Sequence, residues 1–278
     1  MLTPFDHALA VLLVAMFPVW GSTLGYRRLK RADPDDRPRL RLVQYGRAIA
    51  VQWLLAGALL VLWVAQRRAL SPAPAGLGMM PLLTWGLGGV VLGTVIVLIY
   101  LLRVRAHIMS DDEGLAEVRR ELANVEPLMP HTPREFRWFV ALALTAGLCE
   151  ELLYRGFLIW YFAHFMGVIP AALVATVAFG VGHSYQGVRG ALKALAAGGF
   201  LSAVYLLSGS LFMPMLLHAL MDLHSGHLAY VAYAREDAER EAERLRAAEV
   251  QWEGEGGTEA PPATGAPPQD EGNDAASL

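Results

Sequence analysis

The chain has 278 residues, of which 55% are hydrophobic and 18% are charged, and its mean hydropathy is positive. A soluble domain usually carries about 25% charged residues, and here long apolar blocks alternate with short charged loops, which argues against one large soluble core. The net charge of −3 gives no reason to expect a nucleic-acid partner, and the single cysteine, Cys149, excludes an internal disulfide.

Seven apolar blocks are long enough to be membrane-spanning helices, because a helix that rises about 1.5 Å per residue needs about 20 apolar residues to cross the hydrocarbon layer. In chain order these blocks are Ala8–Gly25, Ala48–Gln66, Pro81–Leu102, Trp138–Phe162, Val168–Tyr185, Gly190–Leu207 and Leu211–Tyr230. The fourth block could equally be two pieces. The predicted fold class is therefore all-α, a polytopic transmembrane helical bundle of seven or eight spans.

The loops between these blocks alternate between many and few Lys and Arg residues, and the basic loops are expected to be cytoplasmic. With seven spans the N-terminus is outside and the C-terminus is cytoplasmic, in an integral protein of the bacterial plasma (inner) membrane. We expect four regions: an N-terminal membrane region with three spans (1–137), a membrane core (138–234), a charged cytoplasmic helix (235–252) and a disordered acidic tail rich in Gly and Pro (253–278).

The fourth block keeps ionisable residues in its middle, in the string ALTAGLCEELLYRGFLIW. Such a residue at the bilayer centre costs about 2.5–3.5 kcal/mol, so it is by default a candidate functional residue. Glu151 and Arg155 are four residues apart on one helix face and can pair. Glu150 lies about 100° around the helix, where it can face another helix as a general base. The alternative is a buried ion pair that only holds helices together.

Two later blocks add histidines. In VATVAFGVGHSYQG, Phe179 and His183 share one helix face. In MPMLLHALMDLHSGH, His218 and Asp222 are four residues apart, so Asp222 can reach an imidazole nitrogen and fix its tautomer. Each histidine could also be an ordinary hydrogen-bonded core residue. Counted along their blocks, Glu150, His183 and His218 lie within about 6 Å of one depth, which is compatible with one site.

In this order, the strings EELLYR, FGVGH and HALMD resemble the motifs of the CPBP family, which contains CAAX proteases and bacteriocin-processing (Abi) proteins. The resemblance covers about Trp138–Gly226. It implies an intramembrane metalloprotease similar to type II CAAX prenyl endopeptidases, acting on a membrane-associated protein or peptide. The last motif position is Asp222, whereas the prenyl-protein branch has Asn, so that branch's substrate does not transfer directly.

The resemblance also implies roles for the matched residues. The predicted catalytic residues are Glu150, Glu151, Arg155, His183, His218 and Asp222. Glu150 would activate water with help from His183, and His218 would stabilise the oxyanion with Asp222. The predicted metal ligands are Glu150, His183 and His218, a set that suits a divalent ion such as zinc, although a metal-free pair of Glu150 and His183 is chemically possible.

Three other interpretations stay open. The polar residues could only pack helices in a non-catalytic membrane scaffold or adaptor. They could relay protons in a coupled transporter, although the sequence has no evident repeated halves. A cysteine protease could use Cys149 with His183, but the neighbouring Glu150 and Glu151 would disfavour the thiolate.

Overall fold

The computed structural model describes residues 2–15, 23–69, 112–254 and a few positions between 95 and 103. Most of the predicted span Pro81–Leu102, the middle of Ala8–Gly25 and the tail beyond residue 254 lie outside the described residues. The chain divides into two units, 1–234 and 235–278. Throughout the described part the regular secondary structure is helical, with no strand, as the sequence predicts.

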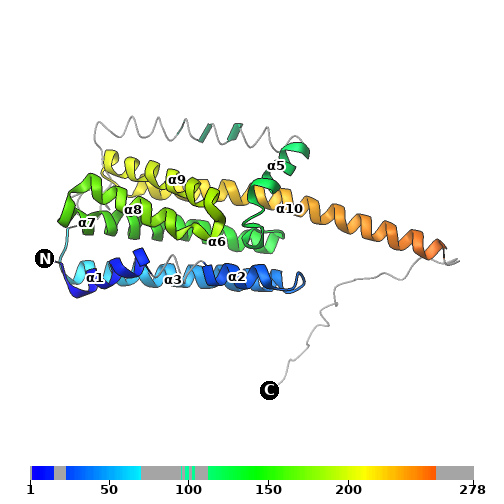
Figure 1. Ribbon diagram of the computed structural model, residues 1–278, viewed down its shortest axis with the longest axis horizontal. Coiled ribbons are helices and arrows are strands. Elements are labelled where there is room, and N and C mark those ends of the chain that lie inside the picture. The colour runs from blue at the N-terminus through cyan, green and yellow to red at the C-terminus, as the bar shows by residue number, and fades with distance from the viewer. Residues whose placement is uncertain are drawn as a thin grey trace, which may run out of the picture. The chain divides into compact units, whose positions relative to one another are not determined.

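The first unit contains all six predicted catalytic residues, and Figure 1 labels its helices. They are α1 (Pro4–Val11), α2 (Thr23–Arg31), α3 (Arg37–Ala65), α5 (Asp112–Leu122), the 3₁₀ turn η2 (Glu126–Leu128), α6 (Pro133–Glu151), the π-helical segment η3 (Leu152–Leu158), α7 (Ile159–Met166), α8 (Val168–Gly182), the 3₁₀ turn η4 (Ser184–Gln186), α9 (Gly187–Ser208) and the first part of α10 (Phe212–Gly254).

The fourth predicted block is one continuous helical run rather than two pieces, because α6, η3 and α7 follow one another without a break. A capping box starts the run: Thr132 Oγ1 accepts a hydrogen bond from the Glu135 backbone N–H at 3.2 Å, and Glu135 Oε2 accepts one from the Thr132 N–H at 3.0 Å. The run ends at Gly167, whose φ of 81° lies in the left-handed region that favours glycine.

Two described helices are long and apolar enough to cross a membrane, Arg37–Ala65 and Ser184–Ser208, and two shorter apolar helices are Pro4–Ala15 and Val168–Gly182. The predicted count of seven or eight spans is therefore not confirmed. Chain breaks and charges shorten the apolar runs: Gly167 and His183 bound α8 on either side, and α6 begins with a charged first turn.

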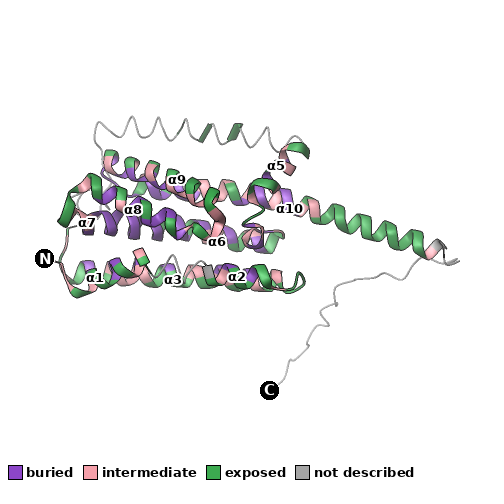
Figure 2. Cartoon of the chain, viewed as in Figure 1, coloured by how far each residue is buried: buried purple, intermediate pink, exposed green. Residues whose placement is uncertain are grey.

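The first unit exposes large apolar residues and buries several ionisable ones, beside a buried apolar core. On α8 a stripe of large apolar residues at four-residue spacing is exposed, namely Ile169, Leu173, Val177 and Val181. By contrast, Glu151 and Arg155 are only 0% and 1% exposed. Figure 2 shows the buried residues on the sides of the helices that face their neighbours. This arrangement suits a hydrocarbon surrounding, in which apolar faces meet lipid and ionisable groups turn inward.

A hydrophobic core holds α1 and α3 against η3, α7 and α8. In this core the Trp63 and Trp160 rings meet edge to face with centroids 4.6 Å apart. At the start of α3, the buried Arg41 donates to Glu135 Oε1 at 2.8 Å and to the Pro127 carbonyl at 2.9 Å. These contacts fix the position of α3 along α6.

In the second unit α10 continues to Gly254 with exposed side chains. Arg235 lies 3.2 Å from Glu239, and Arg240 lies 2.6 Å from Glu236, each pair at a spacing of four residues. Along this stretch the helix carries oppositely charged side chains that pair on its exposed surface.

Candidate functional site

Glu151 is fully buried and, together with its partner Arg155, connects α6, η3, α9 and α10. Its Oε1 accepts a hydrogen bond from Arg155 Nη1 at 2.6 Å and lies 2.7 Å from His218 Nδ1. Because an ionised carboxylate only accepts hydrogen bonds, His218 Nδ1 carries its hydrogen and donates. Arg155 Nη2 in turn donates to the Gly198 carbonyl on α9 at 3.1 Å. Oε1 of Glu151 is therefore held by one guanidinium and one imidazole, whereas Oε2 is buried with no hydrogen-bond partner among the described residues.

Arg155 lies in the π-helical segment η3, and such segments frequently occur at functional sites. Its guanidinium also lies over the ring of Phe179 on α8, 4.4 Å from the centroid. Gly198 makes this approach possible, because a Cβ there would lie 3.0 Å from Phe179 Cδ1 and 3.2 Å from Arg155 Nη2. The guanidinium is thus enclosed by α8 and α9.

Glu150 is also buried, but its partner differs from those of Glu151. Its Oε1 accepts a hydrogen bond from Nε2 of Gln52 on α3 at 3.2 Å. An amide holds a carboxylate without neutralising its charge. Sequence reasoning missed Gln52, although a signal was present, since Gln52 is an uncharged polar residue inside an apolar block.

His183 follows α8 directly, and its Nδ1 donates a hydrogen bond to the Phe179 carbonyl at 2.8 Å. Its Nε2 in the neutral ring therefore carries the lone pair. The Phe179 ring centroid lies 4.5 Å from that of His183 and 5.8 Å from that of His218. Both histidines thus contact the same aromatic ring.

Asp222 lies at the open side of this cluster, with its side chain 39% exposed. Its Oδ2 is 3.7 Å from His218 Nε2, which is too long for a hydrogen bond. The predicted tautomer-fixing role therefore falls to Glu151 at Nδ1. Asp222 still interacts electrostatically with Glu150, Glu151, His183 and His218, so the structure brings the predicted residues into one charged cluster.

The predicted metal ligands do not form a three-ligand set. Among the described residues, no group of three or more His, Cys, Asp or Glu side chains is arranged to hold a metal ion. His218 Nδ1 is engaged by Glu151, and His183 Nδ1 by a backbone carbonyl. The donor atoms of Glu150, His183 and His218, as placed, do not fit a metal centre.

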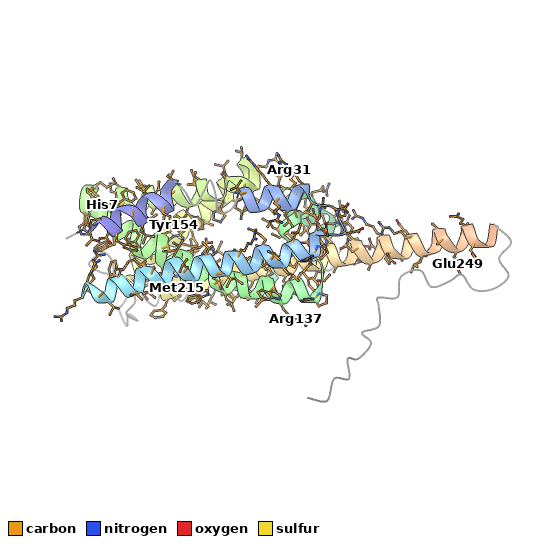
Figure 3. All side chains as sticks on the ribbon, turned by 90° about the horizontal axis from the view of Figure 1, so that it is seen from below. His7, Arg31, Arg137, Tyr154, Met215 and Glu249 are labelled. Carbon is orange, nitrogen blue, oxygen red and sulfur yellow. The ribbon has the colours of Figure 1, made fainter. Side chains whose placement is uncertain are left out.

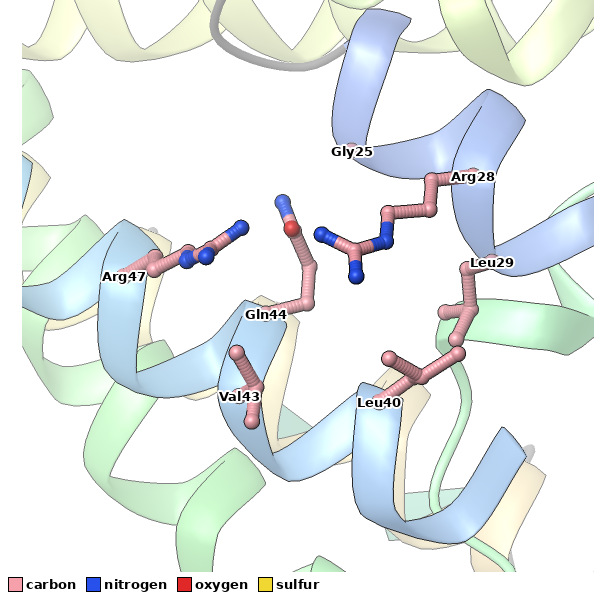
Figure 4. Close-up of a pocket in the computed structure, with 7 residues that line it drawn as sticks. All are labelled: Gly25, Arg28, Leu29, Leu40, Val43, Gln44 and Arg47. Atoms are coloured by element: carbon pink, nitrogen blue, oxygen red, sulfur yellow. The ribbon is translucent and has the colours of Figure 1, made fainter. Parts of the chain in front are cut away.

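Two pockets in the described part of the chain are lined by residues outside the cluster of predicted catalytic residues. Residues of α2 and α3 line the first, which Figure 4 shows: Gly25, Arg28, Leu29, Leu40, Val43, Gln44 and Arg47. It contains no carboxylate or imidazole, so it offers no general base for hydrolysis. The second is mostly apolar and is lined by Leu98, Leu102, Phe136, Leu220, Leu223, His224 and His227.

The fold and the site define an all-helical protein in which apolar helices enclose a cluster of two glutamates, an arginine and two histidines. Residues 132–224 match the family model of the type II CAAX prenyl endopeptidase Rce1-like proteins, so this stretch of the chain is similar to that family. The match includes all six predicted catalytic residues and excludes Gln52. Comparisons with curated proteins and with solved structures gave no match.

Proposed function

We propose that the chain is an intramembrane endopeptidase that hydrolyses a peptide bond in a membrane-associated protein or peptide. The contrast between two adjacent glutamates is the observation that carries this proposal. Glu151 is bound by Arg155 and His218, whereas Glu150 has an amide partner, Gln52. The carboxylate of Glu150 therefore keeps the capacity to take a proton from water. The family match to CAAX prenyl endopeptidases supports the same class of reaction.

In the proposed reaction Glu150 takes one proton from a water molecule while the water oxygen attacks the scissile carbonyl carbon. The lone pair on His183 Nε2 accepts a hydrogen bond from this water and orients it. The carbonyl oxygen gains negative charge, and His218, protonated on both ring nitrogens, stabilises it by donating a hydrogen bond from Nε2. Glu150 then gives its proton to the departing amine nitrogen as the C–N bond breaks.

Glu151 and Arg155 do not contact the substrate in this reaction. They act through His218, whose ring Glu151 holds in place. Because His218 Nδ1 donates to Glu151, its Nε2 side faces Asp222 and the rest of the cluster. Every step above uses side chains alone. The predicted divalent metal remains a separate prediction, and elemental analysis of the purified protein for zinc would test it.

Burial and family support a membrane location for this reaction. The exposed apolar stripe of α8 and the apolar helix α3 suit contact with lipid. Figure 3 shows Arg31 and Arg137 at one end of the first unit and His7 at the other. A basic end of this kind is expected on the cytoplasmic side, in agreement with the proposed orientation.

The test uses the full-length protein in liposomes with an internally quenched, farnesylated CAAX peptide. We expect wild-type protein to cleave the peptide, and Glu150→Ala and His183→Ala each to lower kcat by about 10²–10⁴-fold while the protein stays folded. His164→Ala is the matched control, because His164 lies on α7 with its Nδ1 on the Trp160 carbonyl. Cleavage by Glu150→Ala at the wild-type rate would contradict the proposal.

A further inference from the structure

We infer that Gln52, which lies outside the segment that matches the protease family, is a positioning residue of the site. It holds the Glu150 carboxylate in the orientation needed to deprotonate water. This inference rests on the proposed function. It means that the N-terminal membrane region contributes to the site through α3, in addition to the domain at 132–224.

The geometry of Gln52 supports a role beyond packing. The residue is only 6% exposed, and its Nε2 lies 3.2 Å from Glu150 Oε1. A carboxylate cannot donate, so the amide nitrogen, rather than the amide oxygen, must face it. One hydrogen bond from a side chain 98 positions away in the sequence thus fixes the orientation of Glu150.

The other end of the same amide is also informative. Gln52 Oε1 is buried, and no described residue donates a hydrogen bond to it. An unpaired buried acceptor is costly, and proteins usually keep such a group only where it has a use. The oxygen can accept a hydrogen bond from the attacking water or from a backbone N–H of a bound peptide.

Other contacts already hold α3 against α6, so Gln52 is not required for that task. One residue further along α3, Trp53 Nε1 donates to Thr145 Oγ1 at 3.2 Å. Near the start of the helix, Arg41 is paired with the buried Glu135 at 2.8 Å. Loss of the Gln52 amide should therefore leave α3 in place and affect Glu150.

Kinetics with the peptide assay described above test the role. Gln52→Met keeps the length of the side chain and removes both polar atoms, and we expect it to lower kcat by about 10- to 100-fold with KM unchanged. Gln52→His places a ring N–H near the position of Nε2 and should recover most of the lost kcat. Trp53→Phe removes the neighbouring hydrogen bond and should stay within about twofold of wild type.

The expected order of kcat values distinguishes a positioning role of Gln52 from a packing role. If Gln52→Met keeps the wild-type kcat, or if Gln52→His is no better than Gln52→Met, the inference is wrong, even when Glu150→Ala is inactive and the proposed function stands.

A thermal-unfolding cycle tests the contact without any activity. The Tm loss of Gln52→Met combined with Glu150→Ala should be smaller than the sum of the two single losses. The combination of Trp53→Phe with Glu150→Ala should be additive. An additive Gln52 cycle would refute the contact. A coupled cycle together with an active Glu150→Ala variant would refute the proposed function and retain the contact.

Discussion

At the scale of single residues, two neighbouring glutamates have opposite surroundings. Both are buried, yet Glu151 has a cation and an imidazole as partners, and Glu150 has a neutral amide. A rotation of about 100° around one helix therefore separates a carboxylate that organises the cluster from a carboxylate suited to proton transfer. The two residues should respond differently to mutation.

Glu151→Ala should destabilise the protein by about 3–5 kcal/mol, because it leaves the buried guanidinium of Arg155 without its counter-charge. Thermal unfolding in detergent measures this loss. Glu117→Ala is the control, since Glu117 pairs with Arg120 on an exposed surface and should cost about 0–1 kcal/mol. Equal unfolding temperatures for Glu151→Ala and Glu117→Ala would contradict the structural role assigned to Glu151.

One local contact of the site could be predicted from the sequence and another could not, and its long-range hydrogen bonds were not predicted. The pair of Glu151 and Arg155 follows from four-residue spacing, and it is present at 2.6 Å. The same rule predicts Asp222 as the partner of His218, but Glu151, from another helix, takes that place. The contact of Gln52 with Glu150 was not predicted, because a hydrogen bond between residues 98 positions apart leaves no periodic pattern in one sequence.

At the scale of helices, close packing of α6 on α10 depends on a glycine. A Cβ on Gly147 would lie 2.8 Å from both the backbone nitrogen and the Cβ of Ala219, and 2.9 Å from the carbonyl oxygen of Met215. Backbone atoms cannot move aside as a flexible side chain can, so the two helices would have to separate. This contact also sets the distance between Glu151 on α6 and His218 on α10.

Gly147→Ala should therefore lower stability by about 1–3 kcal/mol through overpacking, although alanine is the better helix former. Gly57→Ala on α3 is the matched control, because a Cβ there meets nothing within 4 Å, and it should be neutral or slightly stabilising. Circular dichroism at 222 nm during heating measures both. A Gly147→Ala protein as stable as Gly57→Ala would show that the helices are not packed this closely.

The presence of helices was easier to predict than their bounds. The sequence predicts helices over the blocks that become α3, α6, α8 and α9, because apolar runs favour helices locally. It does not predict the π-helical segment at Leu152–Leu158, since one extra residue per turn changes no composition. The predicted spans also ignored breaks such as the one at His183, which shortens the fifth block.

At the scale of the whole first unit, a charged junction joins the start of α3 to the turn before α6. Interaction with His131, whose Nε2 lies 3.2 Å away, lowers the pKa of Glu126 below its ordinary value of 4.5, against the opposing effect of burial. Arg37 and Arg41, at 3.7 and 3.9 Å, act in the same direction. A lowered carboxyl pKa stabilises the folded state only while the carboxyl is ionised.

The junction should therefore contribute to stability at pH 7 and lose that contribution as pH falls below about 4.5, through the lowered pKa of Glu126. The Tm difference between wild type and Glu126→Gln, followed from pH 7 to pH 3, measures the contribution. We expect a positive difference at neutral pH that vanishes in acid. A difference that is constant over this range would show that the Glu126 charge is not involved.

The π-helical segment between α6 and α7 has a consequence for how these helices address their neighbours. A π turn accommodates one residue more than an α turn, and each residue of an α-helix turns the chain by about 100°. An extra residue would otherwise turn everything after it by that angle, and the wide turn takes it up. Deleting a single residue within Leu152–Leu158 should therefore restore ordinary helix there and leave the helix after it facing the same neighbours. Trp160 would still meet Trp63, and the Tyr161 hydroxyl, 2.7 Å from His7, would keep its place. The wide turn thus keeps the acids at the end of α6 and the aromatic rings of α7 directed at their own neighbours along one continuous helical run.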